Sequence, residues 1–159
     1  MGPRLPVRLT ALVFLAACTP VTARPDFQPF PQAQSVVLVA RPPQVIPFLA
    51  TLVATESLRV KRASPRDGYL ETEWYDARTH RSFTDDDHVP DLAHTVKLRC
   101  WADPYVPGET ILTLEVAYRP RYDPSRVERD LETLAPRGHD GYAVAEGLLA
   151  KLKKRFGSP

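Results

Sequence analysis

The stretch TVKLRCWADPYVPGETILTLEVAYR, residues 95–119, decides the fold. Apolar and polar side chains alternate in both halves, and the middle, PYVPGE, has the prolines and glycine of a turn. Successive side chains of a strand point to opposite faces, so this alternation predicts one apolar and one polar face. The predicted inward residues are Val96, Leu98, Cys100, Leu112, Leu114, Val116 and Tyr118. We therefore predict an antiparallel hairpin.

Two kinds of pattern flank this hairpin: short runs typical of strands, and apolar side chains at the spacing of one helical face. The strand-like runs are 35–40, 57–62 and 69–76, and the helix-like runs are 44–56, 125–134 and 141–156. One sheet with helices on a single face would bury every apolar stripe. The predicted fold class is α+β: a single antiparallel sheet of about five strands with two main helices packed on one face.

The start of the chain has the layout of an exported leader. Arg4 and Arg8 form a positive region, an apolar run follows, and LAAC (15–18) resembles the bacterial lipobox. The apolar run is far shorter than the roughly 20 residues that span a bilayer. The resemblance implies a signal peptide at 1–17 and a mature chain that begins with an acylated Cys18. An ordinary signal peptide and a short buried helix are the alternatives.

Charge and composition set further bounds on the mature chain. The sequence has 21 basic and 19 acidic residues, and two of the basic ones, Arg4 and Arg8, precede Cys18. The remainder is balanced, so nothing in the charge calls for nucleic acid. Residues 18–34 are rich in proline and predict an extended tether, in which Phe27 and Phe30 would dock on the domain or on a partner. The domain is then expected at 35–159.

A longer resemblance rests on the segment GYLETEW, residues 68–74. Behind a lipobox and a proline-rich tether, its glycine, threonine and tryptophan resemble the BamC-like lipoproteins of the outer-membrane assembly machinery. Those residues are Gly68, Thr72 and Trp74. The resemblance implies a helix-grip domain and a place among envelope proteins. Thr19 after the cysteine, by likeness to enteric sorting rules, implies the outer membrane and its periplasmic face.

The sequence offers little that resembles a catalytic site. Carboxylates and histidines crowd only in the acidic loop 84–94, whose spacing matches no dedicated calcium or zinc motif. Cys100 lies among inward apolar residues, which predicts an inert thiol. We therefore predict no catalytic residue, no metal and no cofactor. An envelope hydrolase or metal-dependent enzyme that uses the acidic loop remains the alternative.

The polar face of the sheet is the predicted partner-binding surface. Alternation places Tyr75 and Trp101 there, close to Arg99 and Arg119, and exposed aromatic residues with arginines are typical of protein contacts. The alternative is that the loop 77–93 or the tether covers this face. The predicted function is a membrane-anchored, non-enzymatic binding or scaffold module of the envelope. A small-ligand or lipid carrier is a further alternative, because a helix against a sheet can enclose a pocket.

Overall fold

The computed structural model describes residues 22–84 and 92–157 of the 159. The signal peptide at 1–17, the acylated Cys18 and most of the acidic loop therefore lie outside the described residues. The described part is an α+β domain with an antiparallel sheet, which confirms the predicted class. None of its helices is long and apolar enough to cross a membrane.

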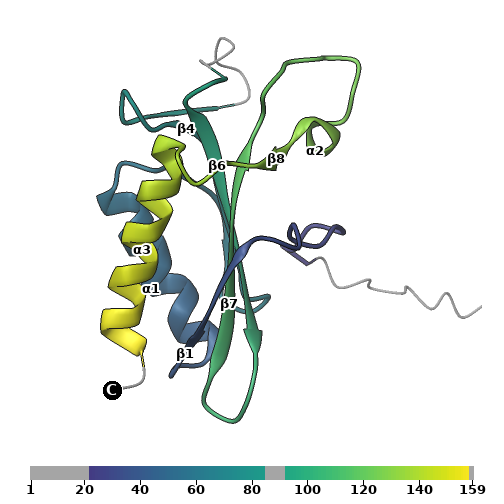
Figure 1. Ribbon diagram of the computed structural model, residues 1–159. Coiled ribbons are helices and arrows are strands. Elements are labelled where there is room, and N and C mark those ends of the chain that lie inside the picture. Colours follow the sequence, from purple (N-terminus) through teal and green to yellow (C-terminus); the bar gives the residue numbers. More distant parts are fainter. Residues whose placement is uncertain (1–21, 85–91, 158–159) are drawn as a thin grey trace, which may run out of the picture.

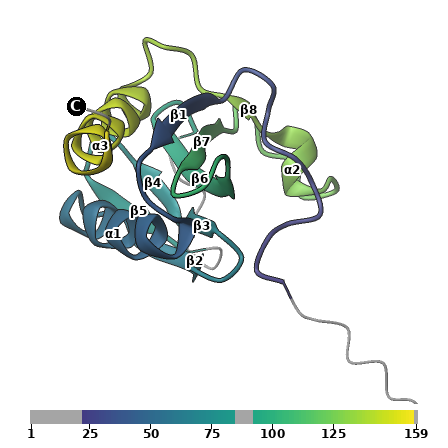
Figure 2. The ribbon, with the colours of Figure 1, turned by 90° about the horizontal axis from the view of Figure 1, so that it is seen from below.

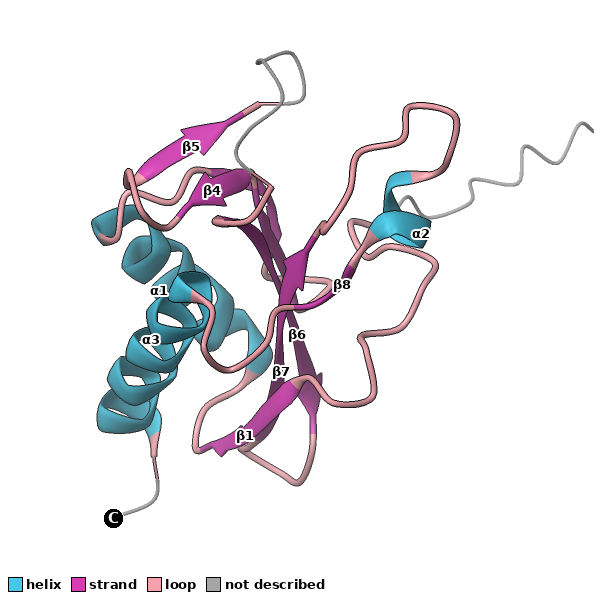
Figure 3. Ribbon diagram, turned by 45° about the horizontal axis from the view of Figure 1, so that its top comes forward, coloured by secondary structure: helices cyan, strands magenta, loops and turns pink. Residues whose placement is uncertain are grey.

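The sheet has eight strands, so the prediction of about five was too low. They are β1 (Gln34–Leu38), β2 (Val60–Ser64), β3 (Tyr69–Thr72), β4 (Trp74–Asp76), β5 (Arg81–Phe83), β6 (Thr95–Pro104), β7 (Thr110–Tyr118) and β8 (Thr133–Leu134). Five of them run in the order β1-β7-β6-β3-β2, and the short β4, β5 and β8 attach beside them. Figure 3 shows β4 and β5 at the end of the sheet away from the β6–β7 turn. The additional strands have two or three residues, too few for a periodic pattern to be recognised.

Three helices accompany the sheet: α1 (Pro42–Thr55), α2 (Glu128–Leu131) and α3 (Asp140–Phe156). In Figures 1 and 2, α1 and α3 lie beside one another on one side of β6 and β7. The rings of Phe48 in α1 and Phe156 in α3 meet edge to face, 5.2 Å apart. The same views show α2 and the chain before β1 on the other side of the sheet.

The helix predicted at 125–134 is much shorter in the structure. Ser125 and Glu128 have the spacing of a helix capping box, but the Ser125 hydroxyl donates to Asp123 and α2 begins only at Glu128. The chain after α2 becomes strand β8 and pairs with the outer edge of β7. Leu134, expected on the helix, thus joins the sheet.

The apolar core lies between the sheet and the helices α1 and α3. The inward residues of the β6–β7 hairpin belong to it, as predicted, and meet Leu49 and Val53 from α1 and Leu148 and Leu152 from α3. Cys100 is fully buried there, and both burial and the charge of Glu115 raise the pKa of its thiol. The expected burial of this cysteine is confirmed.

A β-bulge at the junction of β3 and β4 reverses the predicted alternation. Glu71 pairs with Arg99 of β6, whereas Tyr75 pairs with Val96. Three residues separate Glu71 from Tyr75, but only two separate Val96 from Arg99, so the β3–β4 side carries one extra residue. An insertion of one residue moves the following side chains to the opposite face.

The bulge corrects the placement of two aromatic residues. Tyr75, expected on the polar face, is buried in the apolar core, and its hydroxyl bonds to His80 at 2.8 Å. Trp74, which strict alternation with Tyr75 would turn inward, lies against Lys97 and Arg119 on the polar face. Strict alternation through residues 69–76 was therefore wrong after Thr72.

Candidate functional site

The polar face of the sheet carries a buried cluster of charges centred on Arg99. Its guanidinium donates to Glu132 at 2.6 and 2.7 Å, to Glu115 at 3.1 Å and to Glu71 at 3.2 Å. Arg129 also contacts Glu115 at 2.6 Å and Glu132 at 3.2 Å. We call these two arginines and three glutamates the charge cluster. Burial would lower the pKa of Arg99, but the hydrogen bonds and charge of Glu132, with Glu71 and Glu115, raise it.

Four elements of the fold assemble this cluster. Arg99 and Glu115 lie opposite one another on β6 and β7, and Glu71 lies opposite Arg99 on β3. Arg129 belongs to α2, and Glu132 follows it directly. The short helix and β8 therefore carry the second arginine and the third carboxylate onto the sheet.

Residues 22–33, in the predicted tether, cover the charge cluster. The Arg129 guanidinium stacks on Phe30 and Phe27, with its central carbon 3.8 and 4.2 Å from the ring centres. Arg129 also donates to the Gln28 carbonyl at 3.1 Å, and the Phe30 amide donates to Glu115 at 2.9 Å. Nearer the start of this segment, Arg24 pairs with Asp103 at 2.8 Å. Phe27 and Phe30 therefore dock on the domain, one of the two outcomes expected for them.

The four predicted partner-binding residues do not form an exposed surface. Tyr75 is in the core, Arg99 is in the charge cluster, and Trp101 is buried against the Tyr69 ring at 5.5 Å. Arg119 stacks on Trp74, with 4.5 Å between its guanidinium carbon and the ring centre, and its side chain is mostly covered. The covering segment and the bulge are the physical reasons for this correction.

The carboxylates of the charge cluster are all paired with arginine. Glu115 is fully buried, and every carboxylate of the cluster contacts an arginine. The acidic loop, the other predicted concentration of ligand-type residues, is described only at Thr84 and at 92–94. Within the described ranges, no three His, Cys, Asp or Glu side chains are arranged to hold a metal ion.

The exposed candidate is a groove at the end of the sheet where β6 turns into β7. Its 560 Å³ lies between this turn, the β2–β3 turn and the start of α1, and it includes Arg41, Arg66, Tyr105, Val106 and Glu109. We call it the end groove; Figure 1 shows the turn and the start of α1 at the same end of the molecule. Tyr105 is 60% exposed and Val106 46%, which is unusual for apolar side chains so close together.

The charges around the end groove are not equally available. Asp67 accepts hydrogen bonds from the Ala23 amide and the Ser64 hydroxyl, and these bonds lower its pKa. Arg24 is held by Asp103. Arg41 and Arg66 are exposed and form no ion pair with a carboxylate in the described part of the chain. The groove therefore presents two available cations.

A partial signal for the end groove is present in the sequence. PYVPGE at 104–109 has the composition of a turn, and this composition predicts only a turn. The overlooked signal is the pair Tyr105–Val106 within this turn. Large apolar residues at the tip of a hairpin have no core to enter, so they are expected to be exposed. No known family model matches the chain, and no curated protein sequence matches it.

Proposed function

We propose that this protein is a membrane-anchored lipoprotein of the outer membrane, facing the periplasm, that binds or scaffolds other envelope proteins without catalysing a reaction. The leader with LAAC at 15–18 supports the anchor, through acyl chains on Cys18. Two acyl chains or more are needed for stable anchoring, since one chain holds only marginally.

The end groove is the observation that carries the binding function. Exposed aromatic residues beside arginines are enriched at the centres of protein interfaces. The partner that fits is an extended protein segment with apolar side chains for Tyr105 and Val106 and a carboxylate for Arg41 or Arg66. In this proposal α1 and α3 form one layer on the opposite face from the charge cluster, and the groove at the end of the sheet stays open.

The test is quantitative capture from crosslinked membranes with the full-length protein, its acylation verified by intact mass. The binding variant is Tyr105→Ala with Val106→Ser. Its matched control is Tyr122→Ala with Val127→Ser, which alters another exposed tyrosine and valine, 52% and 70% exposed, away from the groove. A third arm, Cys18→Ser, removes the site of acylation.

The expected result is a partner whose recovery falls at least tenfold with the groove variant, the effect of losing an interface hot spot, and is unchanged in the matched control. Recovery should also depend on Cys18. Equal capture by the groove variant and its control would contradict the proposed surface, and capture independent of Cys18 would contradict the role of the anchor.

A further inference from the structure

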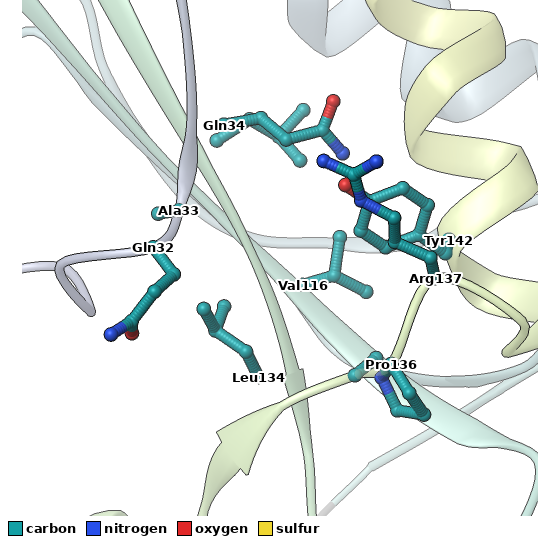
Figure 4. Close-up of a pocket in the computed structure, with 10 residues that line it drawn as sticks. Gln32, Ala33, Gln34, Val116, Leu134, Pro136, Arg137 and Tyr142 are labelled. Carbon is teal, nitrogen blue, oxygen red and sulfur yellow. The ribbon is translucent and has the colours of Figure 1, made fainter.

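A second cavity opens at the edge of the sheet beside the start of α3. It has a volume of about 360 Å³, within the range of small-molecule sites. We call it the edge cavity; Figure 4 shows residues from β1, β7, β8 and the segment leading into α3 around it. Its apolar lining consists of Ala33, Leu114, Val116, Leu134, Ala135, Pro136 and the ring of Tyr142.

The cavity exists because two short strands share one edge of β7 without meeting. β1 pairs with β7 as far as Leu114, and β8 pairs from Ala117 onward. Across the gap, the Ala135 amide donates to the Val116 carbonyl at 2.9 Å, so the backbone there is satisfied. The Val116 side chain is left facing the space between the two strands and α3 (Figure 4).

The polar groups of the edge cavity favour an anion. The side-chain amide nitrogen of Gln34 is buried and has no hydrogen-bond partner among the described residues. Arg137 is exposed, and it forms no ion pair with the carboxylates of the described ranges. In Figure 4 both lie with Tyr142 on the side of the cavity near α3. Among the described residues, no carboxylate lines the cavity.

These groups define one class of ligand. A buried N–H donor without a partner costs about 1–3 kcal/mol, which an acceptor on a ligand would recover. A carboxylate can accept from Gln34 and from Arg137 together, and the bond to arginine is the stronger, charge-assisted kind. Leu114, Val116 and Leu134 then offer an apolar wall to the body of the same molecule.

We propose that the edge cavity binds a single-chain amphiphile: an acyl chain that ends in a carboxylate. The chain packs against the apolar wall from β7 and β8, and the carboxylate accepts hydrogen bonds from Gln34 and Arg137. The cavity shares no lining residue with the end groove, so this site does not depend on the proposed function.

Photocrosslinking in membranes tests the site with the full-length protein. The probe is dodecanoic acid with a diazirine in its chain, and the comparison probe is its uncharged primary amide. Two variants remove the donors, Arg137→Gln and Gln34→Leu. The matched control is Arg121→Gln, which makes the same charge change at an exposed arginine outside the cavity.

Peptide mapping by mass spectrometry should find the acid attached to residues 114–116 or 134–142. Labelling there should fall about tenfold or more in Arg137→Gln, fall in Gln34→Leu and stay unchanged in Arg121→Gln, because a charge-assisted hydrogen bond is lost. The amide probe should label weakly. Labelling spread along the chain, or equal labelling by acid and amide, would overturn the proposal, as would an Arg137→Gln variant that labels like the native chain.

Discussion

Both faces of the sheet are buried at its centre, but they are held by different forces. On β6, Leu98 points toward α1 and α3 and is 0% exposed, and its neighbour Arg99 points to the other face and is 4% exposed. The first face is closed by apolar packing. The second is closed by ion pairs and by arginine stacked on phenylalanine. The alternating sequence of β6 therefore contributes side chains both to the apolar core and to the charge cluster.

This difference shows what an alternating pattern can establish. Alternation distinguishes two environments, and polar residues on one face of an antiparallel sheet predict contact with water. Here they mean contact with other charges. Burying a charge is costly unless it is paired, so Arg99 is tolerated because Glu71, Glu115 and Glu132 surround it.

The largest expected effect comes from removing Arg99. Arg99→Met leaves buried carboxylates with fewer cations, and breaking a buried ion pair in this way costs about 3–5 kcal/mol of unfolding free energy. Leu98→Ala, the neighbouring change on the apolar face, is expected to cost about 2–5 kcal/mol through its cavity. Urea denaturation followed by tryptophan fluorescence measures both, since Trp74 and Trp101 lie on the charged face.

A double-mutant cycle then separates pairing from packing. Glu132→Gln removes the charge that contacts Arg99 at 2.6 and 2.7 Å, and the double variant should recover part of the loss. A coupling energy of about 1–3 kcal/mol is expected between the two sites. Crossing Leu98→Ala with Glu132→Gln, whose side chains lie on opposite faces, should give additive effects. A coupling energy near zero between Arg99 and Glu132 would contradict the view that ion pairing holds the charged face.

A smaller effect is expected where residues 22–33 cover the charge cluster. Phe30→Ala removes a ring that stacks on Arg129, and the lost stacking and apolar burial together amount to about 1–2 kcal/mol. Hydrogen exchange should quicken at the Phe30 amide, which donates to Glu115, and through residues 22–33. Exchange within α1 and α3 should stay as in the native chain. Faster exchange in both layers would show that the two faces do not respond separately.

The comparison of the two faces also explains which features of the fold could be predicted from the sequence and which could not. The β6–β7 hairpin was predicted because eight or more residues in each strand keep a period of two. The bulge near Glu73 was missed because one inserted residue breaks the period without leaving a compositional signal. The cover on the charge cluster has no period at all, and it joins Arg129 to Gln28, residues about a hundred positions apart. The end groove and the edge cavity are each lined by segments far apart in the chain, which no local pattern encodes.

The smallest expected effect tests whether the apolar layer responds to pH. His139 caps α3, its Nδ1 accepting from the Gly141 amide at 3.0 Å. Burial lowers the pKa of His139, against the opposing influence of the Ala93 backbone and Asp140. The unfolded chain therefore takes up this proton more readily than the folded one. Stability should fall as the pH drops through the unfolded value of about 6.5.

His139→Asn keeps a side-chain acceptor at the cap and removes the titrating group. At pH 7.5 the variant should match the native chain within about 1 kcal/mol, because both caps accept a hydrogen bond there. Between pH 7.5 and 5.5 the native chain should lose stability faster than the variant, and urea midpoints at each pH measure the difference. Protonated His139 cannot accept from Gly141, so the loss belongs to the helix layer. Identical pH profiles for the two proteins would contradict a role of the His139 cap. They would mean that the layer of α1 and α3 is held by packing alone.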